Sequence, residues 1–217
     1  MSKEIKPVKG GVYLVADGSM EPALLMKKLE KALEAGVSII QLYNIADDAD
    51  TTISHINNIC VLAHSFGVPV LINNNWLLIN RTLLDGVHFD KIPERLSFIE
   101  NTIREDFIKG ITCTNDLQVI EWANAHHFTY VSFCSMFPSP SAGACEIVSF
   151  ETVKKARSLT QMPIFLAGGL NTGNLQKLSS LSFDGIAVIS GIMSATDITA
   201  STSQFITELS KIQNHES

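Results

Sequence analysis

Long apolar runs are missing from this sequence of 217 residues, and charge of either sign is scarce. No run approaches the ~18 apolar residues that a membrane-spanning helix needs, so the sequence predicts no membrane segment. Charged residues make up 18% of the chain, and 16 Lys and Arg against 22 Asp and Glu give a net charge of -6. A nucleic-acid-binding protein needs clustered Lys and Arg, and we find no such stripe. Neither a membrane nor a nucleic acid is therefore an expected partner.

Cysteine is also scarce, and the four thiols do not form a recognisable pattern. They are Cys60, Cys113, Cys134 and Cys145, with neither a CxxC pair nor the spacing of zinc ligands. We expect free thiols in a reducing compartment. Residues 1–7 carry charges and have no apolar segment behind them, which predicts no secretory signal and a cytoplasmic protein.

Short apolar strands alternate with helical segments along the whole chain, and apolar residues make up 46% of it, as in a globular protein. The predicted strands cover 11–16, 37–42, 69–73, 86–89, 108–112 and 129–133, and two more begin at Pro163 and Gly185. The predicted helices cover 21–35, 50–66, 76–83, 93–103, 115–125 and 149–159, a segment from Asn171, and 198–212. Eight β/α units without a linker predict a single (β/α)8 barrel domain over residues 1–217, with an open doubly wound sheet as the alternative.

Small residues follow the last two predicted strands. One strand runs into Gly168-Gly169, and the other runs into Ile189-Ser190-Gly191. Glycine has no Cβ, so backbone N–H groups can approach an anion closely, and the start of a helix favours negative charge. In (β/α)8 barrels these two loops commonly build a phosphate site. We expect the backbone of Gly168, Gly169, Ile189 and Ser190 to bind the phosphate of a small molecule.

Other functional residues of a barrel lie just after each strand, at the carboxyl-terminal face. Here these positions hold amides, hydroxyls and glycines, and no Lys or Arg. The candidates for ligand contact are Gln41, Asn73, Ser139 and Ser141. For the two serines, a plain loop is an equal alternative, and Asn73 with its two neighbouring asparagines also suits a turn that caps a helix.

The candidates for catalysis are Gln41, Asn73 and Cys134, and none of them has a pattern that specifies a reaction. No metal site is expected, and Asp90 is the one carboxylate considered as a metal ligand. His88 ends a predicted strand, and we favour a hydrogen-bonded place in the core for it. His64, on the second predicted helix, is expected to be solvated.

Several of these segments together resemble the thiamine-phosphate synthase and TenI superfamily over nearly the full length of the chain. The resemblance is carried by eight segments: Val12-Tyr-Leu-Val-Ala-Asp17, Ala35-Gly-Val-Ser-Ile-Ile-Gln-Leu42, Val70-Leu-Ile-Asn-Asn74, Leu84-Asp-Gly-Val-His88, Tyr130-Val-Ser-Phe133, Phe137-Pro-Ser-Pro-Ser141, Ala167-Gly-Gly-Leu170 and Gly185-Ile-Ala-Val-Ile-Ser-Gly-Ile192. It implies a role in thiamine biosynthesis. There a synthase joins an aminopyrimidine pyrophosphate to a thiazole phosphate with the help of magnesium.

The departures from that family lie on the side of the site that handles pyrophosphate. Synthases usually place Arg and Lys where this chain has Tyr43 and Ile45, and magnesium-binding Asp where it has Asn74 and Pro93. A further family Lys, after the sixth strand, is Ala142 here. The departure of pyrophosphate depends on metal and cation stabilisation of developing charge, so the resemblance implies a degenerate pyrophosphate and magnesium half.

Three hypotheses follow, and whether the chain is an enzyme stays open. The first is a protein of thiamine biosynthesis that binds a thiazole or thiamine phosphate, with altered chemistry such as that of a thiazole tautomerase. The histidine that this branch commonly uses is replaced by Thr114, and Cys113 or Cys134 would have to move the proton. The second is an active synthase, for which magnesium would be the cofactor. The third is a non-catalytic regulator that binds a phosphate ligand. A homodimer is considered because exposed helix faces of barrels often pair.

Overall fold

Eight parallel strands form a closed barrel in the computed structural model, in which each strand pairs with the next and β8 pairs with β1. The structure describes residues 8–45, 49–104, 106–139 and 146–213. The strands are β1 Gly11–Asp17, β2 Ile39–Tyr43, β3 Val70–Asn73, β4 Gly86–Phe89, β5 Ile108–Cys113, β6 Tyr130–Cys134, β7 Ile164–Ala167 and β8 Gly185–Val188. The predicted (β/α)8 barrel is confirmed, and the doubly wound sheet was wrong because β1 and β8 close the sheet.

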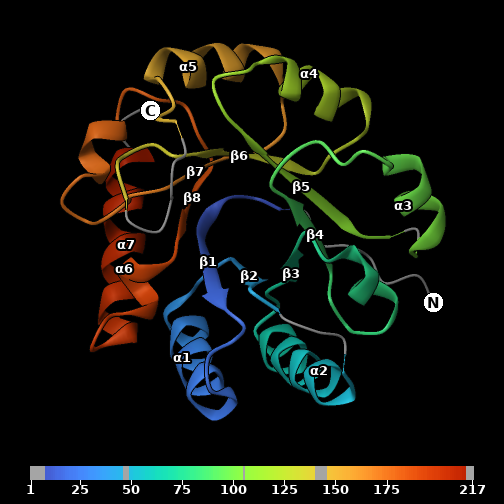
Figure 1. Cartoon of the computed structure of the whole chain (residues 1–217). Helices are drawn as coiled ribbons and strands as arrows, with labels where there is room; N and C mark the ends of the chain where they lie inside the picture. The colour runs from blue at the N-terminus through green and yellow to red at the C-terminus, as the bar shows by residue number, and fades with distance from the viewer. Residues whose placement is uncertain (1–7, 46–48, 105, 140–145, 214–217) are drawn as a thin grey trace.

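Helices surround the strands as an outer ring (Figure 1). They are α1 Pro22–Ala35, α2 Asp50–Ser65, α3 Leu96–Thr102, α4 Gln118–Ala125, α5 Phe150–Leu159, α6 Ser190–Met193 and α7 Ile198–Gln213, with the 3-10 helices η1 Trp76–Asn80 and η3 Leu175–Leu178. Among the described residues, none of these helices has the length and apolar character needed to cross a bilayer.

Four predicted segments differ from the observed helices. The helix predicted over 93–103 is shorter and covers only Leu96–Thr102. The segments predicted over 76–83 and from Asn171 form only the short 3-10 helices η1 and η3. The helix predicted from residue 115 begins at Gln118. Its first residues form a turn instead, in which Asp116 accepts from the Gln118 N–H and Asn115 bonds to the Ile147 carbonyl. Local side-chain bonds of this kind compete with the helix.

His64 is a further correction. Its Nε2 lies 2.6 Å from the Asp85 carboxylate, and its side chain is about one-quarter exposed rather than solvated. The same Asp85 oxygen accepts the Val70 N–H, so His64 helps to fix the start of β3. This pairing joins α2 to the turn before β4, and the helix pattern alone does not specify it.

Aromatic side chains fill the interior of the barrel below its carboxyl-terminal mouth. Tyr13, Tyr130 and Phe165 are fully buried and meet edge to face, with ring centroids 5.4 to 5.8 Å apart. Gly110 pairs in register with both His88 and Tyr130, and a Cβ on it would lie 2.1 Å from the Tyr130 ring. Because glycine stands there, the Tyr130 ring crosses β5 and stacks on His88. These aromatic rings form the base of the site described next.

Candidate functional site

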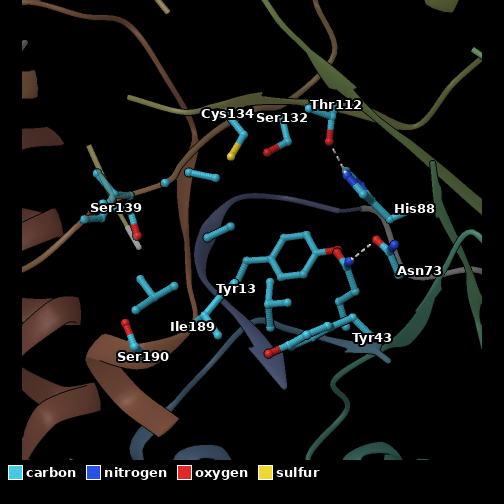
Figure 2. Close-up of a pocket in the computed structure, with 18 of the residues that line it drawn as sticks. Tyr13, Tyr43, Asn73, His88, Thr112, Ser132, Cys134, Ser139, Ile189 and Ser190 are labelled. Atoms are coloured by element: carbon cyan, nitrogen blue, oxygen red, sulfur yellow. Dashed lines mark hydrogen bonds between the residues drawn. The ribbon is translucent and has the colours of Figure 1, made fainter. Parts of the chain in front are cut away.

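A polar cavity of about 310 Å³ opens at the carboxyl ends of the strands (Figure 2). Residues from all eight strands and from the segments after β4, β6, β7 and β8 line it: Tyr13, Val15, Gln41, Tyr43, Asn73, His88, Asp90, Thr112, Ser132, Cys134, Ser139, Ala167, Gly168, Gly169, Leu170, Ala187, Val188, Ile189, Ser190 and Gly191. Of these lining residues of the described chain, Asp90 alone carries a formal charge, and none is Lys or Arg.

Gly168, Gly169, Ser190 and Gly191 form one side of the cavity, which we call the backbone cup. Both Gly168 and Gly169 adopt positive φ, +87° and +65°. A Cβ on Gly169 would lie 2.5 Å from the Phe137 carbonyl oxygen, so only glycine fits without a shift of the loop. Ser190 and Gly191 begin α6, ahead of Ile192, whose N–H is the first to bond back to Ile189. A glycine loop beside the start of a helix, where N–H groups have no partner within the helix, favours an anion.

Hydrogen bonds hold the glycine loop of the backbone cup from both sides. The carbonyls of Ala167 and Gly168 accept from the N–H groups of Met136 and Phe137, and the Gly169 carbonyl accepts from the Asn174 amide. The loop carbonyls are thus occupied by neighbouring segments. The predicted residues Gly168, Gly169, Ile189 and Ser190 all line the cavity, as does Ser139.

Ser141, the other predicted serine, lies outside the described residues. Cys134 lines the cavity and is half-buried. Figure 2 shows Cys134, Ser139 and Ser190 on one side of the Tyr13 ring, with Asn73 and His88 on the other. The candidate residues therefore divide into two groups across the cavity.

The second group is joined by side-chain amides. Gln41 is buried, accepts the Tyr13 hydroxyl at 2.5 Å and donates to Asn73 Oδ1 at 2.6 Å. Asn73 in turn donates to Asp90 Oδ2 at 3.1 Å, and Asn74 donates to the same oxygen at 2.6 Å. The predicted residues Gln41, Asn73 and Asp90 are thus brought together. The sequence did not predict Tyr13 as their partner. The signal lies in the register, because Gln41 pairs with Val15, and Tyr13 lies two residues before Val15 on the same face of β1.

His88 lies at the base of this group and is buried, as predicted. Its Nδ1 lies 2.9 Å from the Tyr130 hydroxyl, and its Nε2 lies 2.8 Å from Thr112 Oγ1. Burial lowers the pKa of His88 to about 4, and the negative charge of Asp90 only partly opposes this. The imidazole is therefore neutral at pH 7.

Tyr43 and Asp17 form a hydrogen-bonded pair at the rim of the cavity, separate from the two groups described above. Burial raises the pKa of Tyr43, and the adjacent Asp17 carboxylate raises it further. Burial also acts to raise the pKa of Asp17, but hydrogen bonds from Ser19, Asn44 and Tyr43 outweigh it and lower that pKa. Asp17 therefore carries a negative charge at neutral pH. Tyr43, at a position where synthases usually have a cation, is a neutral hydroxyl.

The residues around Asp90 do not fit a magnesium site. Mg²⁺ requires several oxygen ligands in an octahedral arrangement. Here the two neighbouring amides turn their nitrogens toward the carboxylate, Asn73 Oδ1 accepts from Gln41, and Asn74 Oδ1 accepts the Asp90 N–H. Among the described residues, no group of three His, Cys, Asp or Glu side chains is close enough to hold a metal ion.

Cys113 does not suit acid–base chemistry. It is fully buried, does not line the cavity, and burial raises its pKa to about 12. Thr114, at the position where the resemblance implies a histidine, is exposed and also lies outside the cavity lining. Of the two cysteines considered, only Cys134 is therefore placed to meet a ligand.

The closed parallel sheet and its outer helices define the class of protein: a (β/α)8 barrel, with a polar cavity at the face where such barrels carry their functional sites. Residues 12–192 match the family model described as thiamine monophosphate synthase, and the chain belongs to that family.

Curated relatives agree with this assignment, and a solved structure shares the fold. The chain is 26% identical over 198 residues to the thiamine-phosphate synthase of Halorhodospira halophila, covering 91% of this chain and 93% of the relative. It is 28% identical over 188 residues to that of Clostridium tetani, covering 86% and 90%. The solved thiamine phosphate pyrophosphorylase of Pyrococcus furiosus has the same fold, with a TM-score of 0.80 and 20% identity over 94% of this chain and 98% of that one.

Proposed function

We propose that this chain binds a thiazole phosphate, or the thiamine phosphate that contains it, in the cavity at the barrel mouth. In this proposal the backbone cup binds the phosphate. Ser139 and the group that contains Gln41 and Asn73 contact the rest of the ligand. One observation carries the proposal: the cavity offers backbone N–H groups at one end, while no cation lines the other. That contrast supports one phosphate site and disfavours a second site for pyrophosphate. The proposal places this binding in the cytoplasm.

The charge of Asp90 and the hydrogen bonds of the amides around it disfavour synthase chemistry. Expelling pyrophosphate requires cations or a metal at the charge that develops on its oxygens. In the described cavity the only charged lining residue is an anion, and the amide oxygens near it are already bonded. We therefore propose that the chain retains the thiazole-phosphate part of a synthase site without efficient synthase activity.

Binding is tested by calorimetry with thiazole phosphate and with the corresponding thiazole alcohol. We expect the alcohol to bind at least about 100-fold more weakly, because it loses charge-assisted hydrogen bonds worth roughly 1.5–3 kcal/mol each. The alcohol is the matched control, since it keeps the ring and lacks only the phosphate. Equal affinity for the two compounds, or no binding of either, would contradict the proposal.

An active synthase is the second candidate, and the names of the curated relatives favour it. The test is product formation from aminopyrimidine pyrophosphate and thiazole phosphate with magnesium. Removing a single electrostatic stabiliser of a transition state costs about 10²–10³ in rate, so we expect turnover at least about 1,000-fold below that of the Clostridium tetani relative assayed beside it. Comparable rates, or growth rescue of a strain without its synthase, would favour the active synthase instead.

A further inference from the structure

The helical side of the backbone cup has all its carbonyl groups occupied. Ser190 and Gly191 belong to the segment 189–193, which contains α6. Three carbonyls of this segment accept backbone N–H groups within it or just after it, those of Ile189, Ser190 and Ile192. The other two accept from side chains of neighbouring helices. This part of the cup is therefore held in place by α1 and α7 as well as by its own backbone.

Lys28, on α1, makes the charged one of these two contacts. Its Nζ donates to the Met193 carbonyl oxygen at 2.5 Å, across 165 residues of sequence, and its side chain is half-buried. The neutral contact comes from α7, where Ser201 Oγ donates to the Gly191 carbonyl at 2.7 Å. Because β1 pairs with β8, the helices that follow these strands, α1 and α7, pack beside each other (Figure 1). Closure of the barrel thus brings a lysine from the first helix to the end of α6.

The Lys28 ammonium lies close enough to the backbone cup to act on a bound anion. The helix between them spans only Ser190–Met193, and four helical residues rise about 6 Å. With a hydrogen bond at one end and a phosphate at the other, the two charges would be roughly 10 Å apart, about one Debye length at an ionic strength of about 0.1 M. The described cavity has no Lys or Arg in its lining. Lys28 therefore supplies positive charge to the cup from behind α6, and not across the open mouth.

We propose that Lys28 is a positioning residue for phosphate binding: it holds α6 against α1, and its positive charge stabilises a phosphate monoester in the backbone cup. This inference rests on the proposed function for the phosphate itself. The dependence of affinity on salt separates this role from a purely structural one. A lysine that only stabilises the fold changes the melting temperature, and its replacement leaves the salt dependence of ligand affinity as it is in the intact chain. A lysine that acts on the phosphate by its charge loses most of its effect at high salt.

The test measures the affinity of Lys28→Met for thiazole phosphate by calorimetry at two ionic strengths. Methionine is unbranched, suits a helix about as well as lysine, and removes the charge. At about 0.1 M we expect a loss of about fivefold, the size of one charge pair across roughly 10 Å with an effective dielectric constant between about 20 and about 80. At about 1 M the Debye length is about 3 Å, and the loss should shrink to about twofold or less.

Lys27→Met is the matched control. It removes the same charge from the neighbouring position of α1, where the side chain is exposed and lies outside the cavity lining, and the affinity should change by less than about twofold at either ionic strength. Lys28→Arg keeps the charge and its N–H donors, so it should retain an affinity within about twofold of the intact chain. Lys28→Gln is a second neutral variant, with the same expected loss as Lys28→Met, and it carries the test if the methionine variant does not fold.

The possible results separate this inference from the proposed function. A loss that shrinks with salt, and that neither Lys27→Met nor Lys28→Arg shows, supports the role of Lys28. An unchanged affinity of the neutral Lys28 variants, a loss of the same size at both ionic strengths, or an equal loss for Lys27→Met would overturn the inference alone. An intact chain that does not bind thiazole phosphate would overturn the proposed function, and this inference with it.

Discussion

Replacing Gly169 with alanine is expected to weaken the binding of thiazole phosphate by at least about 100-fold, the cost of losing two charge-assisted backbone hydrogen bonds. The new Cβ would lie 2.5 Å from the Phe137 carbonyl oxygen and 2.7 Å from that of Pro138. Residue 169 also has φ of +65°, where an alanine is strained by roughly 1–2 kcal/mol. The loop must therefore move, and its N–H groups lose their alignment with the ligand. Calorimetry on the purified variant measures the loss.

Gly173→Ala is the matched control for this prediction. It lies four residues further along the same loop, its φ is not positive, and the nearest atom to a new Cβ is Asn171 Oδ1 at 3.2 Å. We expect its affinity to stay within about twofold of the intact chain, since no cavity-lining backbone is disturbed. If Gly169→Ala melts near the intact chain and still binds thiazole phosphate normally, the backbone cup is not the phosphate site.

The barrel was predictable because its signals are local. Each β/α unit repeats a short apolar run followed by an amphipathic helix, and the eight repeats in one chain define the closed order of strands. The short elements were less predictable. The segment after Asn171 becomes only a 3-10 helix because its asparagines bond to one another and to Gly169, and the helical pattern does not contain that competition.

The sequence predicted which residues line the candidate site, but not the hydrogen bonds and ring contacts that join them. Rules about strand ends placed Gln41, Asn73 and the glycine loops at the mouth, and all of them line the cavity. The contact between Tyr130 and His88 needed knowledge of register, because the Tyr130 ring reaches His88 only where Gly110 lies between them. Contacts across 42 residues of sequence depend on the closed barrel, so no local pattern specifies them.

These connections lie on the side of the cavity where the resemblance implies a degenerate pyrophosphate and magnesium half. Gln41 and Asn73 were predicted as ligand contacts. Their amides already form hydrogen bonds with each other, and Asn73 also donates to Asp90. Their first effect is to hold a carboxylate and a neutral histidine in fixed orientations. No cation lines the described cavity, and the side chains on this side of it are held in place by hydrogen bonds to one another.

The buried histidine should make the protein sensitive to acid. The pKa of His88 is about 4 in the folded protein, against an ordinary value of 6.5. Between these two pH values the unfolded chain binds a proton that the folded chain does not, so the free energy of unfolding falls as pH falls. The contribution of His88 to stability is complete above about pH 6.5 and is lost as pH approaches 4. From pH 7 to pH 4.5 we expect a loss of roughly 2–3 kcal/mol from this residue.

Urea unfolding of the intact chain and of His88→Gln at both pH values isolates this term. Glutamine does not titrate, and its amide can donate to Tyr130 and accept from Thr112, the two groups that contact the imidazole. The carboxylates, including Asp90, titrate in both proteins, so their effects largely cancel in the difference. The variant should be less stable at pH 7 because glutamine packs imperfectly against Tyr130, and its deficit should shrink by roughly 2–3 kcal/mol at pH 4.5. A deficit that is the same at both pH values would show that the imidazole protonates without cost in the fold, and His88 would not be a neutral group held by burial.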